Sequence, residues 1–149
     1  MRPEIPWGEA DLLLGMDPIE SVRAIGPDPE LRVASSDRTS AVINTGLLDD
    51  QQELGQELPE ILEGPLDQLF AMDGMLVGDL AAACRRCFLT DRMLDLVLLG
   101  AAFQRGFVPL TTESIEAALA SMERQGFGRC LDAFALGRHF SVEPEMSEP

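Results

Sequence analysis

The chain has 149 residues, 46% of them hydrophobic, which suffices for one domain with a buried core. Its 26 acidic and 11 basic side chains give a net charge of −15, which repels nucleic acid and anionic membrane surfaces at long range. All basic residues are arginines and His139 is the single histidine, so lysine Schiff bases, Walker-type phosphate lysines and histidine-rich metal sites are excluded.

Neither a secretory signal nor a membrane span is predicted. The N-terminus, "MRPEIPWGEADLLLG", lacks the basic start and apolar segment of a secretory signal. The longest apolar run, "LDLVLLGAAFQRG" (94–106), is shorter than the roughly 20 residues that cross a bilayer, and it contains Asp95. We therefore expect a cytoplasmic protein that has no membrane or nucleic-acid partner.

The first third of the chain predicts strands that alternate with helices. Residues 10–15, "ADLLLG", are typical of a fully buried strand of a parallel sheet. A helix follows, with Asp17 as N-cap and Pro18 at the first helical position. "DPELRVAS" (28–35) predicts another short helix, and "TSAVINTG" (39–46) predicts a second buried strand.

The middle of the chain is less regular. Residues 49–64 contain six acids and no base, which is typical of a solvated loop with a short helix; the alternative is an acidic docking site. "LDQLFAMDG" (66–74) predicts a third short strand that ends at Asp73–Gly74.

Four helices are predicted in the second half. The first runs over 76–88, the second over 94–106 and the fourth over 128–140. The third begins after a capping residue, Thr111 or Thr112. The positions expected on the apolar faces of the third and fourth helices are Ile115, Ala118, Leu119 and Met122, then Leu131, Phe134 and Gly137.

Strand followed by helix, twice over, predicts an α/β fold: a partial doubly wound, mostly parallel sheet of two or three strands, then a helical half of about four helices. Because such sheets usually have about five or six strands, the chain is predicted to be an N-terminally incomplete domain over 1–140. Residues 141–149, "SVEPEMSEP", predict a disordered acidic tail.

Three cysteines are present, and Cys84 and Cys87 form a C-x-x-C pair that encloses Arg85 and Arg86. Such a pair is typical of a redox dithiol or of half a metal site, because neighbouring arginines lower a thiol pKa. Cys130 is the one further cysteine, too few for a four-ligand zinc or iron–sulfur site. The interpretation that we favour is therefore three reduced cysteines on helix faces.

Four segments, in order, resemble blocks of the gamma-type domain of 2-oxoacid:ferredoxin oxidoreductases, closest to the indolepyruvate enzymes. The segments are "GEADLLLGMDPIESVRAI", "TSAVINTG", "LDLVLLGAAFQRGFVPLTTESIEAAL" and "LDAFALGR". The resemblance extends from Gly8 to Arg138 and is weakest between Asp49 and Arg92. It implies a doubly wound α/β domain that supports the oxidative decarboxylation of a 2-oxoacid to an acyl-coenzyme A.

The chain departs from that pattern in two ways. The family's domain opens with a Gly-rich strand-to-helix turn and further strands, which are missing before "ADLLLG". A split gene whose partner polypeptide supplies these strands, or a truncation, would account for this. The family also has asparagine where this chain has Asp95 and Cys130, and an ionised aspartate accepts hydrogen bonds without donating any.

The resemblance implies that the cofactors lie on other polypeptides. Family members pair a Gly-Asp-Gly stretch with downstream asparagines to bind thiamine diphosphate, whereas "VGDLAA" at Gly78–Asp79 is followed by no asparagine. This chain alone is expected to bind no cofactor and to be inactive. In the complex we expect thiamine diphosphate, iron–sulfur clusters and coenzyme A, with thiamine-diphosphate and iron–sulfur subunits as partners.

The candidate site lies at the carboxyl ends of the predicted strands, where open α/β sheets bind ligands. Asn44, Thr45 and Gly46 are the preferred residues, for a coenzyme A or subunit contact, because glycine permits close approach of the backbone. The alternative is a turn held by Asx-type hydrogen bonds. Asp17 and Asp73 are expected to be a helix cap and a turn residue, with no catalytic residue in the chain.

Asp95 needs a separate explanation because it stands in the most apolar segment. A buried carboxylate is costly unless it is hydrogen-bonded, paired or protonated. We therefore predict that Asp95 lies at the N-terminus of its helix, stabilised by free amides and by Arg92 or another arginine.

Three functions remain open from the sequence. The favoured one is a gamma-type subunit or fragment that stabilises the assembly. The second is a repurposed scaffold or interaction module that has lost the enzyme role, which Asp95 and Cys130 favour. The third is a small redox protein that uses Cys84 and Cys87.

Overall fold

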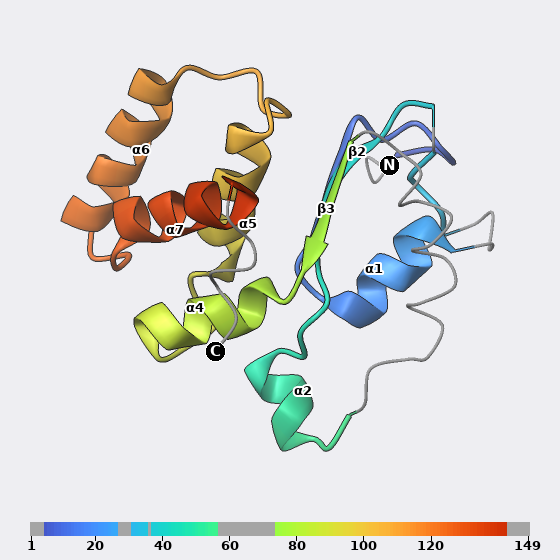
Figure 1. Ribbon diagram of the computed structural model, residues 1–149, viewed down its shortest axis with the longest axis horizontal. Helices are drawn as coiled ribbons and strands as arrows, with labels where there is room; N and C mark the ends of the chain where they lie inside the picture. Colours follow the sequence, from blue (N-terminus) through green and yellow to red (C-terminus); the bar gives the residue numbers. More distant parts are fainter. Residues whose placement is uncertain (1–4, 27–30, 36, 57–73, 143–149) are drawn as a thin grey trace. The chain divides into compact units, whose positions relative to one another are not determined.

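The structure is a computed structural model that describes residues 5–26, 31–35, 37–56 and 74–142. The chain divides into two compact units, Met1–Gly78, which contains the strands, and Asp79–Pro149 (Figure 1). Within the described ranges, three strands and two helices belong to the first unit and four helices to the second. The predicted α/β fold with a helical half is confirmed. No helix in these ranges is long and apolar enough to cross a membrane.

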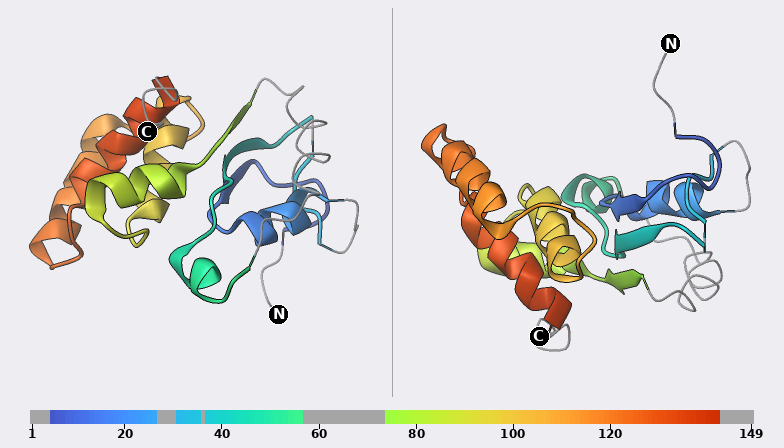
Figure 2. Two further views of the ribbon diagram at one scale, coloured as in Figure 1. Left: turned by 60° about the horizontal axis from the view of Figure 1, so that its bottom comes forward. Right: turned by 90° about the horizontal axis from the view of Figure 1, so that it is seen from above.

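The three strands form a parallel sheet in the order β1-β2-β3 and run in the same direction (Figure 2). Each parallel pair requires a crossover connection, which contains α1 in the first case and α2 in the second. This β-α-β-α-β unit corresponds to one half of a doubly wound sheet. Its elements are β1 (Leu12–Gly15), α1 (Pro18–Ile25), β2 (Ser40–Asn44), α2 (Asp49–Glu53) and β3 (Met75–Gly78).

Burial differs between the strands. In β2, which has a neighbour on each side, all residues from Ala41 to Asn44 are buried. In β1 only Gly15 is buried, and Leu14 is 36% exposed. The prediction of a fully buried first strand was therefore wrong, because β1 lies at one side of the described sheet and is paired with β2 alone.

The α1 helix forms as its sequence predicts. Asp17 caps it by accepting hydrogen bonds from the backbone N–H groups of Ile19 (2.9 Å) and Glu20 (3.4 Å), and Pro18 occupies the first turn. Its last residue, Ile25, joins the core of this unit, together with Ala34, Ala41 and Ile43. The partly buried residues packed against that core are Leu13, Val22, Met75 and Val77.

Three other local predictions need correction or lie outside the described residues. Residues 31–35 form no helix, because the Val33 carbonyl oxygen accepts from the Ala10 N–H and the Val33 N–H donates to the Ala24 carbonyl oxygen; residues 28–30 are not described. The third strand lies at Met75–Gly78, after the predicted 66–74, of which 66–73 are not described. The helix predicted over 76–88 therefore starts later, at Leu80, because its first residues belong to β3.

The second unit consists of four helices: α4 (Leu80–Phe88), α5 (Leu94–Gln104), α6 (Thr112–Arg124) and α7 (Cys130–Val142). Thr111 caps α6 by accepting a hydrogen bond from the Ser114 N–H (3.2 Å), as predicted. In α6, Ile115 and Leu119 are buried whereas Ala118 is exposed. The α7 helix continues to Val142, two residues into the predicted tail, and 143–149 are not described.

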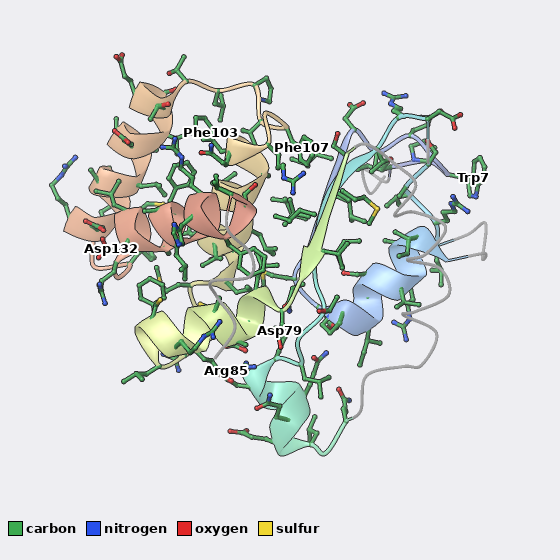
Figure 3. All side chains as sticks on the ribbon, viewed as in Figure 1. Trp7, Asp79, Arg85, Phe103, Phe107 and Asp132 are labelled. Carbon is green, nitrogen blue, oxygen red and sulfur yellow. The ribbon has the colours of Figure 1, made fainter. Side chains whose placement is uncertain are left out.

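The α5 and α7 helices pack most closely of all, and two glycines make this possible. A Cβ atom on Gly100 would lie 2.0 Å from the carbonyl oxygen of Phe134, and one on Gly137 would lie 1.9 Å from that of Val97. Beside this contact the rings of Phe103 and Phe134 lie 5.4 Å apart between centroids; Figure 3 labels Phe103. Because α5 is apolar on nearly all sides, its burial in the helical unit explains why the longest apolar run of the sequence lies here.

Candidate functional site

The carboxyl ends of β1 and β2 lie side by side at one edge of the sheet. The register places Gly15 opposite Ile43, so the residues that follow each strand, Met16 and Thr45, emerge at the same edge. Asn44 lies opposite Gly78 of β3, and the Thr45 N–H donates to the Gly78 carbonyl oxygen (2.9 Å). The candidate residues Asn44, Thr45 and Gly46 therefore lie at the edge where ligands bind in open α/β sheets.

Asn44 is completely buried and joins two loops at this edge. Its Nδ2 donates to the carbonyl oxygens of Met16 (2.9 Å) and Gly46 (2.8 Å), and its Oδ1 accepts from the Gly46 N–H (3.0 Å). The bonds to Gly46 form the Asx-type turn that the sequence left open as an alternative. The bond to Met16 adds a connection between the β1–α1 and β2–α2 loops that no sequence pattern indicated. The amide of Asn44 therefore acts within the fold.

Thr45 and Gly46 differ in what they leave accessible. Gly46 is buried, and both its N–H and its carbonyl oxygen bond to the Asn44 side chain. Thr45 is half-buried, and its hydroxyl makes no hydrogen bond to any residue that the structure describes. Of the three candidate residues, Thr45 alone has a polar side chain without a hydrogen-bond partner in the described part of the chain.

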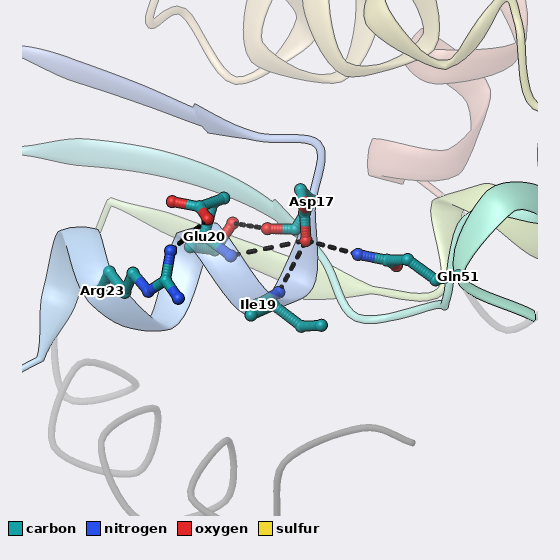
Figure 4. Close-up of polar contacts among 6 residues, drawn as sticks. Asp17, Ile19, Glu20, Arg23 and Gln51 are labelled. Carbon is teal, nitrogen blue, oxygen red and sulfur yellow. Dashed lines mark hydrogen bonds and ion pairs between the residues drawn. The ribbon is translucent and has the colours of Figure 1, made fainter. Parts of the chain in front are cut away.

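Asp17 and Gln51 make a second connection between the same loops (Figure 4). The Gln51 Nε2 donates to Asp17 Oδ1 (2.8 Å), and its Oε1 accepts from the Leu48 N–H (3.0 Å). Ser21 donates its hydroxyl proton to the Asp17 carbonyl oxygen (2.8 Å). Gln51 is 8% exposed, so its amide is almost fully shielded from water. Asp17 is the helix cap that the sequence predicted, with an additional tertiary partner that it did not predict.

Carboxylates make this edge unfavourable for a phosphate group. A helix N-terminus attracts anions through free N–H groups and the positive end of its dipole. In α1 the Asp17 carboxylate already accepts from those N–H groups, and the first turn of α2 contains Asp49 and Asp50. A coenzyme A phosphate would meet negative charge here. This edge of the sheet therefore suits a neutral or basic group of a partner.

The third predicted strand end needs correction. Asp73 lies outside the described residues, and Gly74 precedes β3, whose carboxyl end is at Gly78. Asp79, which follows it, caps α4 by accepting from the Ala82 N–H (2.9 Å) and is labelled in Figure 3. The segment "VGDLAA" therefore forms the junction between β3 and α4.

The cysteines of the C-x-x-C pair have different environments. Cys84 is buried and its Sγ donates to the Thr90 carbonyl oxygen (3.3 Å), whereas Cys87 is exposed. Burial raises the pKa of the Cys84 thiol to about 11, and the opposing effect of Arg85 is small. A low pKa, which a redox dithiol requires, is therefore absent at Cys84. The described residues contain no group of three or more His, Cys, Asp or Glu side chains suited to a metal ion.

Asp95 and Cys130 lie in the same part of the second unit. Asp95 is in the first turn of α5, as predicted, but it is exposed; its Oδ1 accepts from the Leu96 N–H (2.9 Å), and no arginine among the described residues pairs with it, contrary to the prediction. Cys130 is buried and donates to the Phe127 carbonyl oxygen (3.5 Å). Burial first, then the charges of Glu123 and Asp95, raise the pKa of the Cys130 thiol. The Asp95 side chain thus lies outside the core. Neither Asp95 nor Cys130 supplies the side-chain amide that an asparagine at the same position would contribute to a polar network.

Comparisons with known proteins found no match for this chain among protein-family models, curated proteins or solved structures. The resemblance to gamma-type domains therefore stays a prediction from the four sequence segments.

Proposed function

We propose that this chain is a gamma-type subunit or fragment of a 2-oxoacid:ferredoxin oxidoreductase, with an indolepyruvate enzyme as the closest resemblance, and that it stabilises the assembly without carrying out chemistry itself. Oxidative decarboxylation of the 2-oxoacid to an acyl-coenzyme A takes place on the partner polypeptides, which hold thiamine diphosphate and the iron–sulfur clusters. The expected location is the cytoplasm.

The observation that carries this proposal is the internal use of the polar groups at the sheet edge. Asn44 and Gln51 are buried, and their amides bond to the loops around them. A catalytic site instead needs acids, bases or nucleophiles that reach a substrate. An edge whose polar groups hold two loops together suits a structural subunit.

Two features support a contact with another polypeptide at this unit. Leu14 and Met16, at the end of β1, are 36% and 42% exposed, and Thr45 offers a hydroxyl at the neighbouring strand end. A strand at the side of a sheet pairs readily with a further strand. We therefore assign Thr45, of the three candidate residues, to a subunit contact in preference to a coenzyme A contact, with the buried Asn44 and Gly46 holding the loop that presents it.

Co-expression with the thiamine-diphosphate subunit of the same genome tests the proposal. We expect the two to purify together, and we expect Thr45→Arg to weaken the complex by about tenfold or more, because a bulky charge would enter the contact. Gln52→Arg is the matched control, since it adds the same charge to an exposed helix position of the same unit. A folded monomer without affinity for any such subunit would contradict the proposal.

The second candidate function is a repurposed interaction module that has lost the enzyme role. It is favoured by Asp95, whose carboxylate bonds to its own helix, and by the buried Cys130, since neither can replace an amide that both donates and accepts. Activity of the reconstituted complex with Asp95→Asn, alone and combined with Cys130→Asn, separates the two functions. A gain in activity supports the enzyme subunit, and a folded double variant without gain supports the module.

A further inference from the structure

An open surface pocket of about 350 Å³ lies beside α7 in the second unit, and Ala135, His139 and Val142 of its lining are exposed. Its α7 residues, Ala135, Arg138, His139 and Val142, follow the spacing i, i+3, i+4, i+7 and therefore share one helix face. Gln104, the last residue of α5, completes the lining. The pocket thus combines a guanidinium group, an imidazole and a carboxamide with two small aliphatic side chains.

The Arg138 guanidinium is held in position by two contacts. Its Nε donates to Gln104 Oε1 (2.9 Å), and its central carbon lies 5.3 Å from the centroid of the Phe103 ring. The terminal nitrogens Nη1 and Nη2 have no hydrogen-bond partner among the described residues. An arginine fixed through Nε presents these two N–H groups as a planar fork, which matches the two oxygens of a carboxylate.

The surroundings of the pocket differ in charge from the rest of this acidic chain. None of the 26 acidic residues lies in 96–112 or 133–142, the segments that form the ends of α5 and α7. Arg105 adds a second guanidinium, whose Nε donates to the Ser141 hydroxyl oxygen (3.1 Å). Helix carboxyl ends contribute only a partial negative charge, about half an elementary charge each. The two arginines therefore place positive charge beside a pocket whose described lining contains no acidic residue.

We infer that this pocket binds a small organic carboxylate. The two carboxylate oxygens accept hydrogen bonds from Nη1 and Nη2 of Arg138, and a short aliphatic body lies against Ala135 and Val142. The volume is at the lower end of the range of ligand pockets, which restricts the ligand to a small molecule. The aliphatic wall favours a carboxylate with a hydrocarbon body over inorganic phosphate. This inference does not depend on the proposed function.

A titration of the full ¹⁵N-labelled chain tests this inference by following the arginine Nε–Hε signals in NMR spectra. Sodium isobutyrate is the probe, and sodium chloride at equal ionic strength and sodium phosphate are titrated separately. We expect a saturable shift of the Arg138 signal with isobutyrate in the millimolar range, the affinity typical of one charge-assisted contact. The expected shift with phosphate is weaker.

Variants identify the group responsible. We expect Arg138→Gln to lower the affinity for isobutyrate by about tenfold or more. The affinity of Arg138→Lys should lie between those of the wild type and Arg138→Gln, because a lysine keeps the charge and loses the planar fork of N–H groups. Arg124→Gln is the matched control, because it removes the same charge from the exposed end of α6. Far-ultraviolet circular dichroism verifies that each variant is folded.

Three results would overturn the inference. These are shifts equal to those caused by chloride, an equal loss of affinity in Arg138→Gln and Arg124→Gln, and binding of a polyacidic peptide without any binding of isobutyrate. The third result would identify the pocket as part of a protein interface.

Discussion

The two units hold their parts together in different ways. In the first unit, short strands and short helices are connected by buried amides, with Asn44 bonding to Met16 and Gln51 bonding to Asp17. In the second unit, α5 and α7 approach so closely at Gly100 and Gly137 that backbone meets backbone. The first arrangement depends on a few directional hydrogen bonds, and the second depends on the absence of side-chain atoms.

The two units also differ in how their polar side chains are used. The polar side chains at the sheet edge are used within the fold, apart from the Thr45 hydroxyl. In the second unit the Arg138 guanidinium is fixed through Nε and keeps its two terminal nitrogens available. A buried amide with all its bonds made stabilises the fold, whereas a guanidinium fixed through Nε keeps its terminal N–H groups available to water or to a ligand.

The largest expected effect is at the helix contact. Gly137→Ala should destabilise the second unit by about 3 kcal/mol or more, because the new methyl group would overlap the Val97 carbonyl oxygen and the helices would have to separate. Thermal unfolding followed by circular dichroism measures this. Gly106→Ala is the control: its φ is +78° and its Cβ would enter open space, so only about 1 kcal/mol is expected. Equal losses in both variants would contradict the close contact.

The loss of the buried amide in the first unit should have the next largest effect. Asn44→Ala leaves the Met16 carbonyl oxygen and the Gly46 backbone without their partner, so a destabilisation of about 2–3 kcal/mol is expected in urea unfolding. Asn44→Asp should not restore stability at neutral pH, since an ionised carboxylate cannot donate to two carbonyl oxygens. Wild-type stability in either variant would show that the two loops hold together without this amide.

Alkaline pH should weaken the second unit through Cys84. Its thiol has a pKa of about 11 in the folded chain against 9.0 ordinarily, so unfolded chains release the proton first as the pH rises. Stability is therefore complete below pH 9 and is lost between about pH 9 and pH 11, by on the order of 2 kcal/mol. Urea unfolding at several pH values measures the slope, and Cys84→Ala should make it shallower. An unchanged slope in Cys84→Ala would contradict this account.

The smallest expected effect is at the second loop connection. Gln51→Ala removes the hydrogen bonds to Asp17 and to the Leu48 N–H, which should cost about 1–2 kcal/mol in urea unfolding. Gln52→Ala is the matched control, because that side chain is exposed on the same helix, and its effect should stay within about 0.5 kcal/mol. If the two variants lose equal stability, the Gln51–Asp17 bond does not connect the loops.

The sequence by itself determined the features that depend on neighbouring residues. The Asp17 and Thr111 caps, the buried strand at 40–44 and the helices α5 to α7 follow from residue spacing and from capping side chains, which act within a few positions along the chain. The location of Asp95 in the first turn of α5 belongs to the same class. The candidate edge at Asn44, Thr45 and Gly46 was also found from the end of one strand.

The tertiary structure alone decided what these groups contact. The bonds from Asn44 to Met16 and from Gln51 to Asp17 join residues 28 and 34 positions apart, and no local pattern encodes such pairs. Likewise, the exposure of Leu14 depends on whether a strand lies beside β1, and the raised pKa of Cys84 depends on the helices that bury it. The reason is physical: capping and periodicity are short-range, whereas burial and buried hydrogen bonds depend on which distant segments meet.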